Sequence, residues 1–191
     1  MYMRDGFPLT RYFGYTQISK HYEDRGDKRA LSIGDSTILA KLLGFKNIIA
    51  NEYPLQYDIR FLKFDNDSFD ALVSDQVLEH IEGNPFEAIE ESFRVVKPGG
   101  LILHTTTFFN EIHDDKDFWR FSPEGLRIAV EEYGEIIECG GWGNLIAYFM
   151  IRLGLNKIII PESKLNPLNW VAIWNSERTP IFTWVLAKKW K

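Results

Sequence analysis

The stretch SFDALVSDQVLEHIEGNPFEAIEESFRVVKPGGL, residues 68–101, decides the fold. It begins with an apolar run, Ala71–Asp75, that predicts a buried strand. Pro85–Val96 carries apolar side chains at spacings of three and four behind a capping Asn84, and this pattern predicts an amphipathic helix. A second buried strand is predicted at Leu101–Thr107, just after the Pro-Gly-Gly turn. A strand, a helix and a strand in this order indicate one crossover unit of a parallel sheet.

The rest of the chain repeats this alternation. Further strands are predicted at Arg29–Gly34, Asn47–Ala50, Ile59–Phe64, Glu135–Cys139 and Ile181–Ala187, and further helices at Thr37–Leu43, 123–132 and Asn144–Leu155. We therefore expect a doubly wound α/β fold, with a mostly parallel seven-stranded sheet, helices on both faces and an antiparallel last strand. Residues 1–28 are predicted to be an N-terminal leader that packs on one domain, residues 29–191, and residues 156–180 to be irregular.

Composition excludes several classes of function. The chain has 191 residues, 45% of them hydrophobic, and a net charge of −5 without a long basic run, so no nucleic-acid surface is indicated. A single cysteine, Cys139, rules out an internal disulfide. The first residues lack the apolar core of a signal peptide, and no apolar run is long enough to span a membrane. A cytoplasmic protein is expected.

Polar residues follow several of the predicted strands. In an open α/β sheet the ligand lies beyond the carboxyl ends of the strands. Gly34-Asp35-Ser36 follows the first strand, Glu52 follows the second, and Asp75-Gln76 follows the strand in the deciding stretch. An acid in the place of Glu52 can accept both ribose hydroxyls of an adenosine cofactor, and a solvated acid at a strand end is the alternative.

Three segments resemble a known family. Ser68-Phe69-Asp70, Val77–His80 and Arg94–Leu101 resemble the corresponding segment of class I S-adenosylmethionine-dependent methyltransferases of the small-molecule type, whose fold is Rossmann-like. Asp117–Leu126, DFWRFSPEGL, resembles a further signature of a subset often encoded beside polysaccharide-biosynthesis enzymes. The resemblance runs from about residue 30 to the end of the chain.

The resemblance implies S-adenosyl-L-methionine as cofactor and a set of residues that bind it. It places Gly34, Asp35 and Ser36 beside the methionine part, Glu52 at the ribose, Asp58 and Ile59 near the adenine, and Asp75 and Gln76 beside the amino acid and the reacting centre. Tyr53 also belongs to the expected cofactor-binding set. One departure stands out: the family usually has Gly-x-Gly-x-Gly after its first strand, and this chain has only Gly34 there. A methyltransferase fold that binds without catalysing is therefore kept as the alternative.

A hydroxyl acceptor needs a base, and histidine is the natural candidate at neutral pH. His113, in a polar and aromatic loop, is the first choice, His80 the second, and Asp75 completes the predicted catalytic set. His104 lies inside a predicted strand and is expected to be a core histidine. Asp114, Asp115 and Asp117 cluster with His113, but we expect a solvated acidic loop there and no bound metal.

The predicted function is S-adenosylmethionine-dependent O-methylation of a small hydroxyl-bearing acceptor, such as a sugar or glycan precursor. The sugar rests on the Asp117–Leu126 resemblance alone. A nicotinamide oxidoreductase is disfavoured because Gly-x-Gly-x-x-Gly is missing after the first strand. The expected partner is a small molecule, with neither nucleic acid nor a membrane span, and the apolar Asn144–Leu155 segment leaves a homodimer open.

Overall fold

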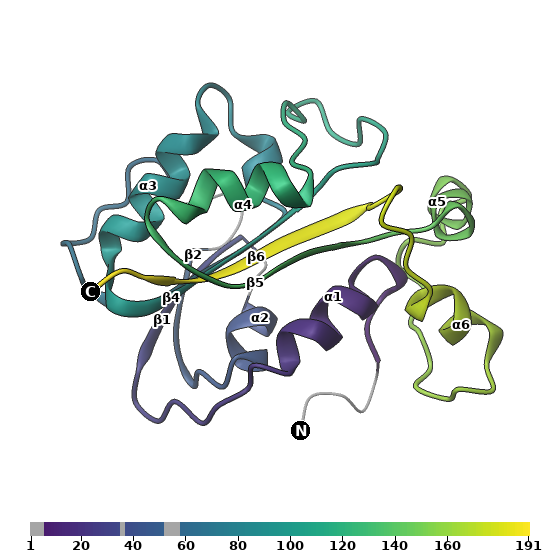
Figure 1. Ribbon diagram of the computed structural model, residues 1–191, viewed down its shortest axis with the longest axis horizontal. Coiled ribbons are helices and arrows are strands. Elements are labelled where there is room, and N and C mark those ends of the chain that lie inside the picture. Colours follow the sequence, from purple (N-terminus) through teal and green to yellow (C-terminus); the bar gives the residue numbers. More distant parts are fainter. Residues whose placement is uncertain (1–5, 35–36, 52–57) are drawn as a thin grey trace.

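A six-stranded sheet forms the centre of the protein, for which a computed structural model describes residues 6–34, 37–51 and 58–191 (Figure 1). The strands are β1 (Arg29–Ile33), β2 (Asn47–Asn51), β3 (Phe69–Asp75), β4 (Val96–Thr107), β5 (Gly134–Trp142) and β6 (Phe182–Lys189). Their order across the sheet is β2-β1-β3-β4-β6-β5. The β1–β2, β1–β3 and β3–β4 pairs are parallel, and β6 is antiparallel to both β4 and β5. The doubly wound sheet with an antiparallel last strand is confirmed.

The prediction of seven strands was wrong, because Ile59–Phe64 forms a turn in place of a strand. The main-chain N–H of Phe61 donates to the carbonyl of Asp58 (2.9 Å), and that of Arg60 donates to the Asp58 carboxylate (2.9 Å). Ile59 and Leu62 are still buried, which explains the apolar signal. Asp58 accepts hydrogen bonds from main-chain N–H groups that would otherwise pair with a neighbouring strand. Residues 59–64 therefore pack on the sheet without joining it.

Helices cover both faces of the sheet (Figure 1). They are α1 (Leu9–Ser19), α2 (Thr37–Leu42), α3 (Pro85–Val95), α4 (Pro123–Glu131), α5 (Leu145–Arg152) and α6 (Pro167–Ile173), with a short 3-10 helix, η2 (Leu78–His80). The α1 and α2 helices lie on one face, α3 and α4 lie on the other, and α5 and α6 stand together at one end of the sheet. Each face has its own buried apolar cluster.

Side-chain caps explain where the predicted helices begin. The Asn84 carboxamide accepts a hydrogen bond from Phe86 N (3.1 Å) at the start of α3, and the Ser122 hydroxyl accepts one from Gly125 N (3.0 Å) at the start of α4. Each helix has proline at its first position, as expected. The description of residues 156–180 as irregular was incomplete, since α6 lies within them.

The first helix, α1, packs closely on the last strand. Its residues Leu9, Tyr15 and Ile18 are buried in the same apolar cluster as Phe182 of β6. A Cβ atom on Gly14 would lie 2.2 Å from a ring carbon of Phe182, so only glycine allows this approach. Residues 1–28 thus contribute a helix to the core, whereas a domain boundary after residue 28 stays a prediction.

The outer surface of α5 is apolar. Leu145, Ile146 and Phe149 are each about half exposed. Within the described ranges, every helix is too short or too polar to cross a membrane. A homodimer through α5 stays a prediction.

Candidate functional site

A cavity of about 380 Å³ opens beside the carboxyl ends of β3 and β4. Its lining comes from α1, both strand ends, the loop after β4, the end of α5 and the start of β6: Thr10, Arg11, Gln76, Thr107, Asn110, Glu111, Ile112, His113, Ile151, Arg152, Asn156, Ile181 and Phe182. The place is the one expected for a ligand of an open α/β sheet. Two predicted site residues, Gln76 and His113, share this cavity.

Gln76 reaches the cavity from a strained backbone. Its φ is 55°, a left-handed conformation that non-glycine residues rarely adopt. The main chain is fixed by a hydrogen bond from Gln76 N to the carbonyl of Thr105 (3.0 Å). The side-chain Nε2 is buried and has no hydrogen-bond partner within the described part of the chain. A buried amide without a partner is costly, so this donor is suited to a ligand.

Gly34 directly follows β1 and has a left-handed backbone conformation, with φ +70°, which favours glycine. A Cβ atom there would lie 3.1 Å from a methyl carbon of Val77, the residue that follows Gln76. The backbone of Gly34 therefore lies close to the end of β3. The predicted residues Asp35, Ser36, Glu52 and Tyr53 lie outside the described residues.

Asp75 is placed away from open solvent, under α1. Its carboxylate accepts hydrogen bonds from Tyr15 Oη, Thr105 Oγ1 and Arg11 Nε, the last at 3.2 Å. Only 8% of the Asp75 side chain is exposed. Burial and the nearby Asp75 carboxylate raise the pKa of the Tyr15 phenol well above its ordinary value. These contacts give Asp75 a role in docking α1. The sequence did not reveal this role, because Arg11 and Tyr15 lie in the segment that was predicted to be a leader.

Asp58 and Ile59 were predicted to lie near an adenine. The Asp58 carboxylate is bound by the Arg60 guanidinium, chiefly through side-chain hydrogen bonds, and this holds the pKa of Asp58 below its ordinary value. Ile59 is fully buried in the apolar cluster on the α3 side of the sheet. Both residues are thus occupied by contacts within the chain.

The two candidate bases, His80 and His113, lie side by side, which their separate sequence motifs did not reveal. The imidazole rings of His80 and His113 are in edge contact, with centroids 5.2 Å apart. His80 Nδ1 lies 2.6 Å from the carbonyl oxygen of Lys116, and His113 Nδ1 lies 2.9 Å from a carboxylate oxygen of Asp117. Each Nδ1 therefore has an acceptor, which leaves Nε2 of each ring to act on a ligand.

The loop between β4 and α4 is pinned against η2. The main-chain N–H groups of Phe118 and Trp119 both donate to the carbonyl of Glu79, at 2.8 and 3.1 Å. The Trp119 indole N–H donates to the carbonyl of Ile81 (3.0 Å). These hydrogen bonds hold the loop against η2 and so bring His113 next to His80. The DFWRF sequence, residues 117–121, therefore has a structural role here, and we call its contacts with η2 the loop clasp.

Asp117 organises the same loop from within. Its side chain is fully buried and accepts hydrogen bonds from Arg120 Nη2 (2.7 Å) and from His113 N (3.0 Å). Burial alone would raise the pKa of Asp117, but the hydrogen bonds from Arg120 and His113 keep it below the ordinary value. Asp114 and Asp115 are exposed and do not join a ligand group with His113 among the described residues.

Glu79 and His104 are two further titratable side chains near these strands that are fully buried. Burial raises the pKa of the Glu79 carboxyl to about 7 and lowers that of the His104 imidazole to about 4. His104 Nδ1 pairs with the Ser74 hydroxyl (2.7 Å) in the middle of the sheet, as expected for a core histidine. Glu79 was overlooked as a site residue, although it directly precedes His80.

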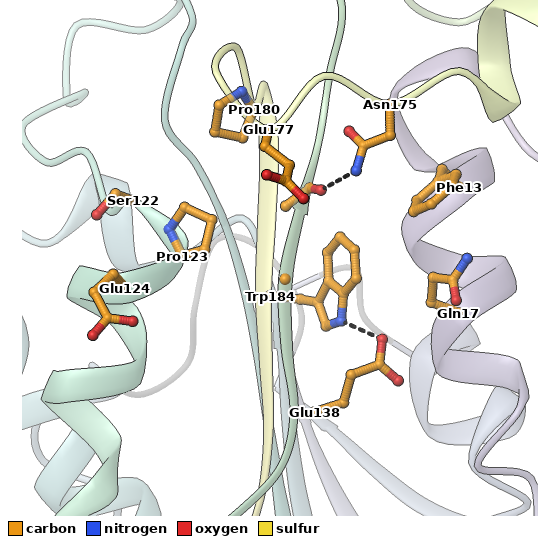
Figure 2. Close-up of a pocket in the computed structure, with 12 residues that line it drawn as sticks. Phe13, Gln17, Ser122, Pro123, Glu124, Glu138, Asn175, Glu177, Pro180 and Trp184 are labelled. Atoms are coloured by element: carbon orange, nitrogen blue, oxygen red, sulfur yellow. Dashed lines mark hydrogen bonds between the residues drawn. The ribbon is translucent and has the colours of Figure 1, made fainter.

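A second cavity, of about 530 Å³, lies between α1 and the start of α4 (Figure 2). Trp184 stands in its centre and donates its indole N–H to Glu138 (3.1 Å), while Phe13 faces in from α1. Of the predicted site residues that the structure describes, none lines this cavity. The cavity at the ends of β3 and β4 is therefore the better candidate.

A comparison with known protein families gives a match. The family described as "Methyltransferase domain" matches residues 14–104, which run from α1 into β4. A search of curated proteins found no match to the sequence.

Solved structures share the fold over nearly the whole chain. A chain of the complex between the Haloferax volcanii Trm112 methyltransferase activator and a methyltransferase is 16% identical, with a TM-score of 0.63, over 95% of this chain and 90% of that chain. Phosphoethanolamine N-methyltransferase 2 of Haemonchus contortus, solved with S-adenosylhomocysteine, is 14% identical, with a TM-score of 0.59, over 93% and 53%. Geranyl diphosphate C-methyltransferase of Streptomyces coelicolor is 13% identical, with a TM-score of 0.56, over 92% and 76%. The fold is thus the Rossmann-like fold of class I methyltransferases, on which acceptors vary widely.

Proposed function

We propose that this protein is an S-adenosylmethionine-dependent methyltransferase that methylates a hydroxyl group of a small acceptor. The observation that carries the proposal is the meeting of Gln76 and His113 in one cavity at the carboxyl ends of β3 and β4. The matching methyltransferase domain and the shared fold support the cofactor.

The described residues at the cofactor side fit this cofactor. Gly34 offers backbone without a side chain at the end of β1, and Gln76 offers a buried amide donor that lacks a partner among the described residues. S-adenosylmethionine, when bound, supplies a methyl group on a sulfonium. The methyl group is transferred by in-line displacement, with S-adenosylhomocysteine as the leaving group. Gly34 and Gln76 would bind and orient it, while Asp75 would hold α1 over the site.

The acceptor side is polar and small. Arg11, Asn110, Arg152 and Asn156 line the cavity together with His113, which gives several hydrogen-bond donors and acceptors for hydroxyl groups. A volume of about 380 Å³ suits a small molecule. During transfer the acceptor oxygen forms a bond to the methyl carbon, the carbon–sulfur bond breaks, and the hydroxyl proton must leave. His113, which lines the cavity, would promote that loss together with His80, whose ring it contacts.

We propose a sugar or glycan precursor as the acceptor, on the basis of the resemblance of Asp117–Leu126 to enzymes of polysaccharide biosynthesis. The alternative is a methyltransferase fold that binds without catalysing, which the single glycine after β1 favours.

Two measurements test the proposal. Calorimetry with S-adenosylhomocysteine should show binding to one site, and incubation with methyl-labelled S-adenosylmethionine and a panel of nucleotide sugars should label an acceptor. Absence of binding at millimolar concentration would refute the cofactor. Binding without transfer to any hydroxyl compound in the panel would favour the non-catalytic alternative.

A further inference from the structure

Three side chains that commonly bind metals converge beside the acceptor cavity. Glu79, His80 and His113 each present a ligand atom, and these three atoms lie within 4.8 Å of one another. Glu79 and His80 belong to η2, after β3, and His113 belongs to the loop after β4. The clasp formed by Phe118 and Trp119 on the Glu79 carbonyl brings the loop to η2.

Both histidines are oriented as metal-binding histidines usually are. The carbonyl oxygen of Lys116 can only accept, so His80 Nδ1 at 2.6 Å carries the proton and Nε2 keeps its lone pair. His113 Nδ1 faces the buried carboxylate of Asp117 at 2.9 Å in the same way. A carbonyl or carboxylate on the second nitrogen is the usual partner of a ligating imidazole, since it fixes the tautomer and the ring orientation.

Glu79 supplies a second, independent observation. Its side chain is fully buried, and Oε2 accepts a hydrogen bond from Thr106 Oγ1 (2.9 Å). The other oxygen, Oε1, is buried without any hydrogen-bond partner among the residues that the structure describes. A carboxylate oxygen in the interior is costly unless a cation or a donor binds it. The two neighbouring imidazoles are lone-pair bases, so a cation satisfies all three groups.

We propose that Glu79, His80 and His113 bind one divalent first-row transition-metal ion, such as Zn²⁺, Mn²⁺ or Co²⁺. Two imidazoles and one carboxylate suit these ions, whereas Mg²⁺ and Ca²⁺ prefer oxygen ligands alone. Metal–ligand bonds of about 2.1 Å place ligand atoms about 3 Å apart, so the three side chains would draw together on binding. Three protein ligands leave coordination positions open.

The site has a consequence for the acceptor, which rests on the proposed function. Because His113 also lines the 380 Å³ cavity, an ion bound to it would lie beside a molecule in that cavity. An ion held there would make a hydroxyl group bound to it a stronger acid, so that its proton would pass more readily to solvent before its oxygen attacks the methyl group. The two imidazoles then promote deprotonation as ligands of the ion rather than as free bases.

Metal binding is tested without any methyl transfer. The purified protein is freed of metal with a chelator and titrated with Co²⁺, followed by visible d–d absorption, and with Zn²⁺, followed by calorimetry. The wild type should bind one ion per chain. Glu79→Gln, His80→Ala and His113→Ala should each abolish the absorption, and Asp117→Asn should weaken binding about 10- to 100-fold because it loosens His113.

Matched controls separate this site from surface binding. His21→Ala removes a histidine whose ring contacts Glu138, outside the cluster, and Asp115→Asn removes an exposed carboxylate of the same loop. Both should bind Co²⁺ as the wild type does. If the wild type binds no ion, or if the cluster variants bind as tightly as the controls, the metal site is refuted. Calorimetry with S-adenosylhomocysteine on the same samples reports separately whether the cofactor proposal stands.

Discussion

The hydroxyl of Tyr15, on α1, donates a hydrogen bond to the carboxylate of Asp75 at the end of β3, 60 residues further along the chain. Arg11 joins the same carboxylate from one turn earlier in α1. These hydrogen bonds hold α1 against the end of β3, next to the candidate site.

Removal of the Tyr15 hydroxyl tests how much its hydrogen bond to Asp75 stabilises the fold. Tyr15→Phe keeps the ring contacts with Phe7 and Phe182 but loses the hydrogen bond to a charged acceptor. We expect the free energy of unfolding to fall by about 1.5 to 3 kcal/mol, measured by urea denaturation. Tyr22→Phe, at a tyrosine that is 60% exposed, is the control and should change stability little. Equal stability of both variants would mean that the hydrogen bond contributes nothing.

Gln76 allows stability and binding to be separated. Gln76→Ala and Gln76→Gly both remove the buried amide, and each should weaken S-adenosylhomocysteine binding about tenfold in calorimetry. At a φ of 55° glycine is unstrained and alanine is not, so the glycine variant should be more stable by about 1 kcal/mol. Wild-type affinity in the glycine variant would show that the Gln76 side chain has no part in binding.

The loop clasp can be tested through Arg120. Its guanidinium binds the buried Asp117 and also donates to the carbonyl of Glu111 (3.1 Å). Arg120→Ala should therefore raise amide hydrogen exchange across residues 110–117 while the strands keep their protection. Arg127→Ala, which removes an exposed arginine paired with Glu124 and Glu131 on α4, is the matched control. Unchanged exchange in the loop after Arg120→Ala would contradict the role given to this residue.

His104 should make stability depend on pH. Its pKa is about 4 in the folded protein against 6.5 ordinarily, because burial disfavours the charged ring. The unfolded chain therefore binds the proton more readily between these values. The contribution of His104 is fully present above pH 6.5 and is lost as the pH falls toward 4, a loss of about 3 kcal/mol.

The double variant Ser74→Ala/His104→Leu removes this titration together with the hydroxyl that pairs with the ring. Its unfolding free energy should change less between pH 7 and pH 4.5 than that of the wild type. An identical pH dependence in the two proteins would assign the acid sensitivity to other groups.

The sequence predicted best what local chemistry determines. Asn84 and Pro85 mark the start of α3, and the same signals at Ser122 and Pro123 mark α4, because a cap needs only neighbouring residues. The segment Ile59–Phe64 misled for the opposite reason: its apolar residues are buried, yet the Asp58 side chain holds the backbone in a turn.

What the sequence concealed depends on contacts between distant residues. The apolar residues of Leu9–Ser19 show only weak helical periodicity, so the helix α1 was not predicted. Its fit depends on a tertiary contact, that of Gly14 with Phe182, which local sequence does not show. The meeting of His80 with His113 required the loop to fold back on η2, and the placement of Asp75 under α1 required Tyr15 and Arg11. Glu79 carried one signal that was available, its position directly before His80.

The place of β6 within the sheet bears on how the chain assembles during synthesis. β5 pairs only with β6 in the described sheet, and β6 lies between β4 and β5 although it comes after both in the chain. During synthesis, residues 134–142 therefore lack the strand with which they pair in the folded protein until residues 182–189 have left the ribosome. β6 also supplies Phe182 to the contact with α1 and to the cavity at the carboxyl ends of β3 and β4. The same strand that closes the sheet therefore also completes the wall of this cavity.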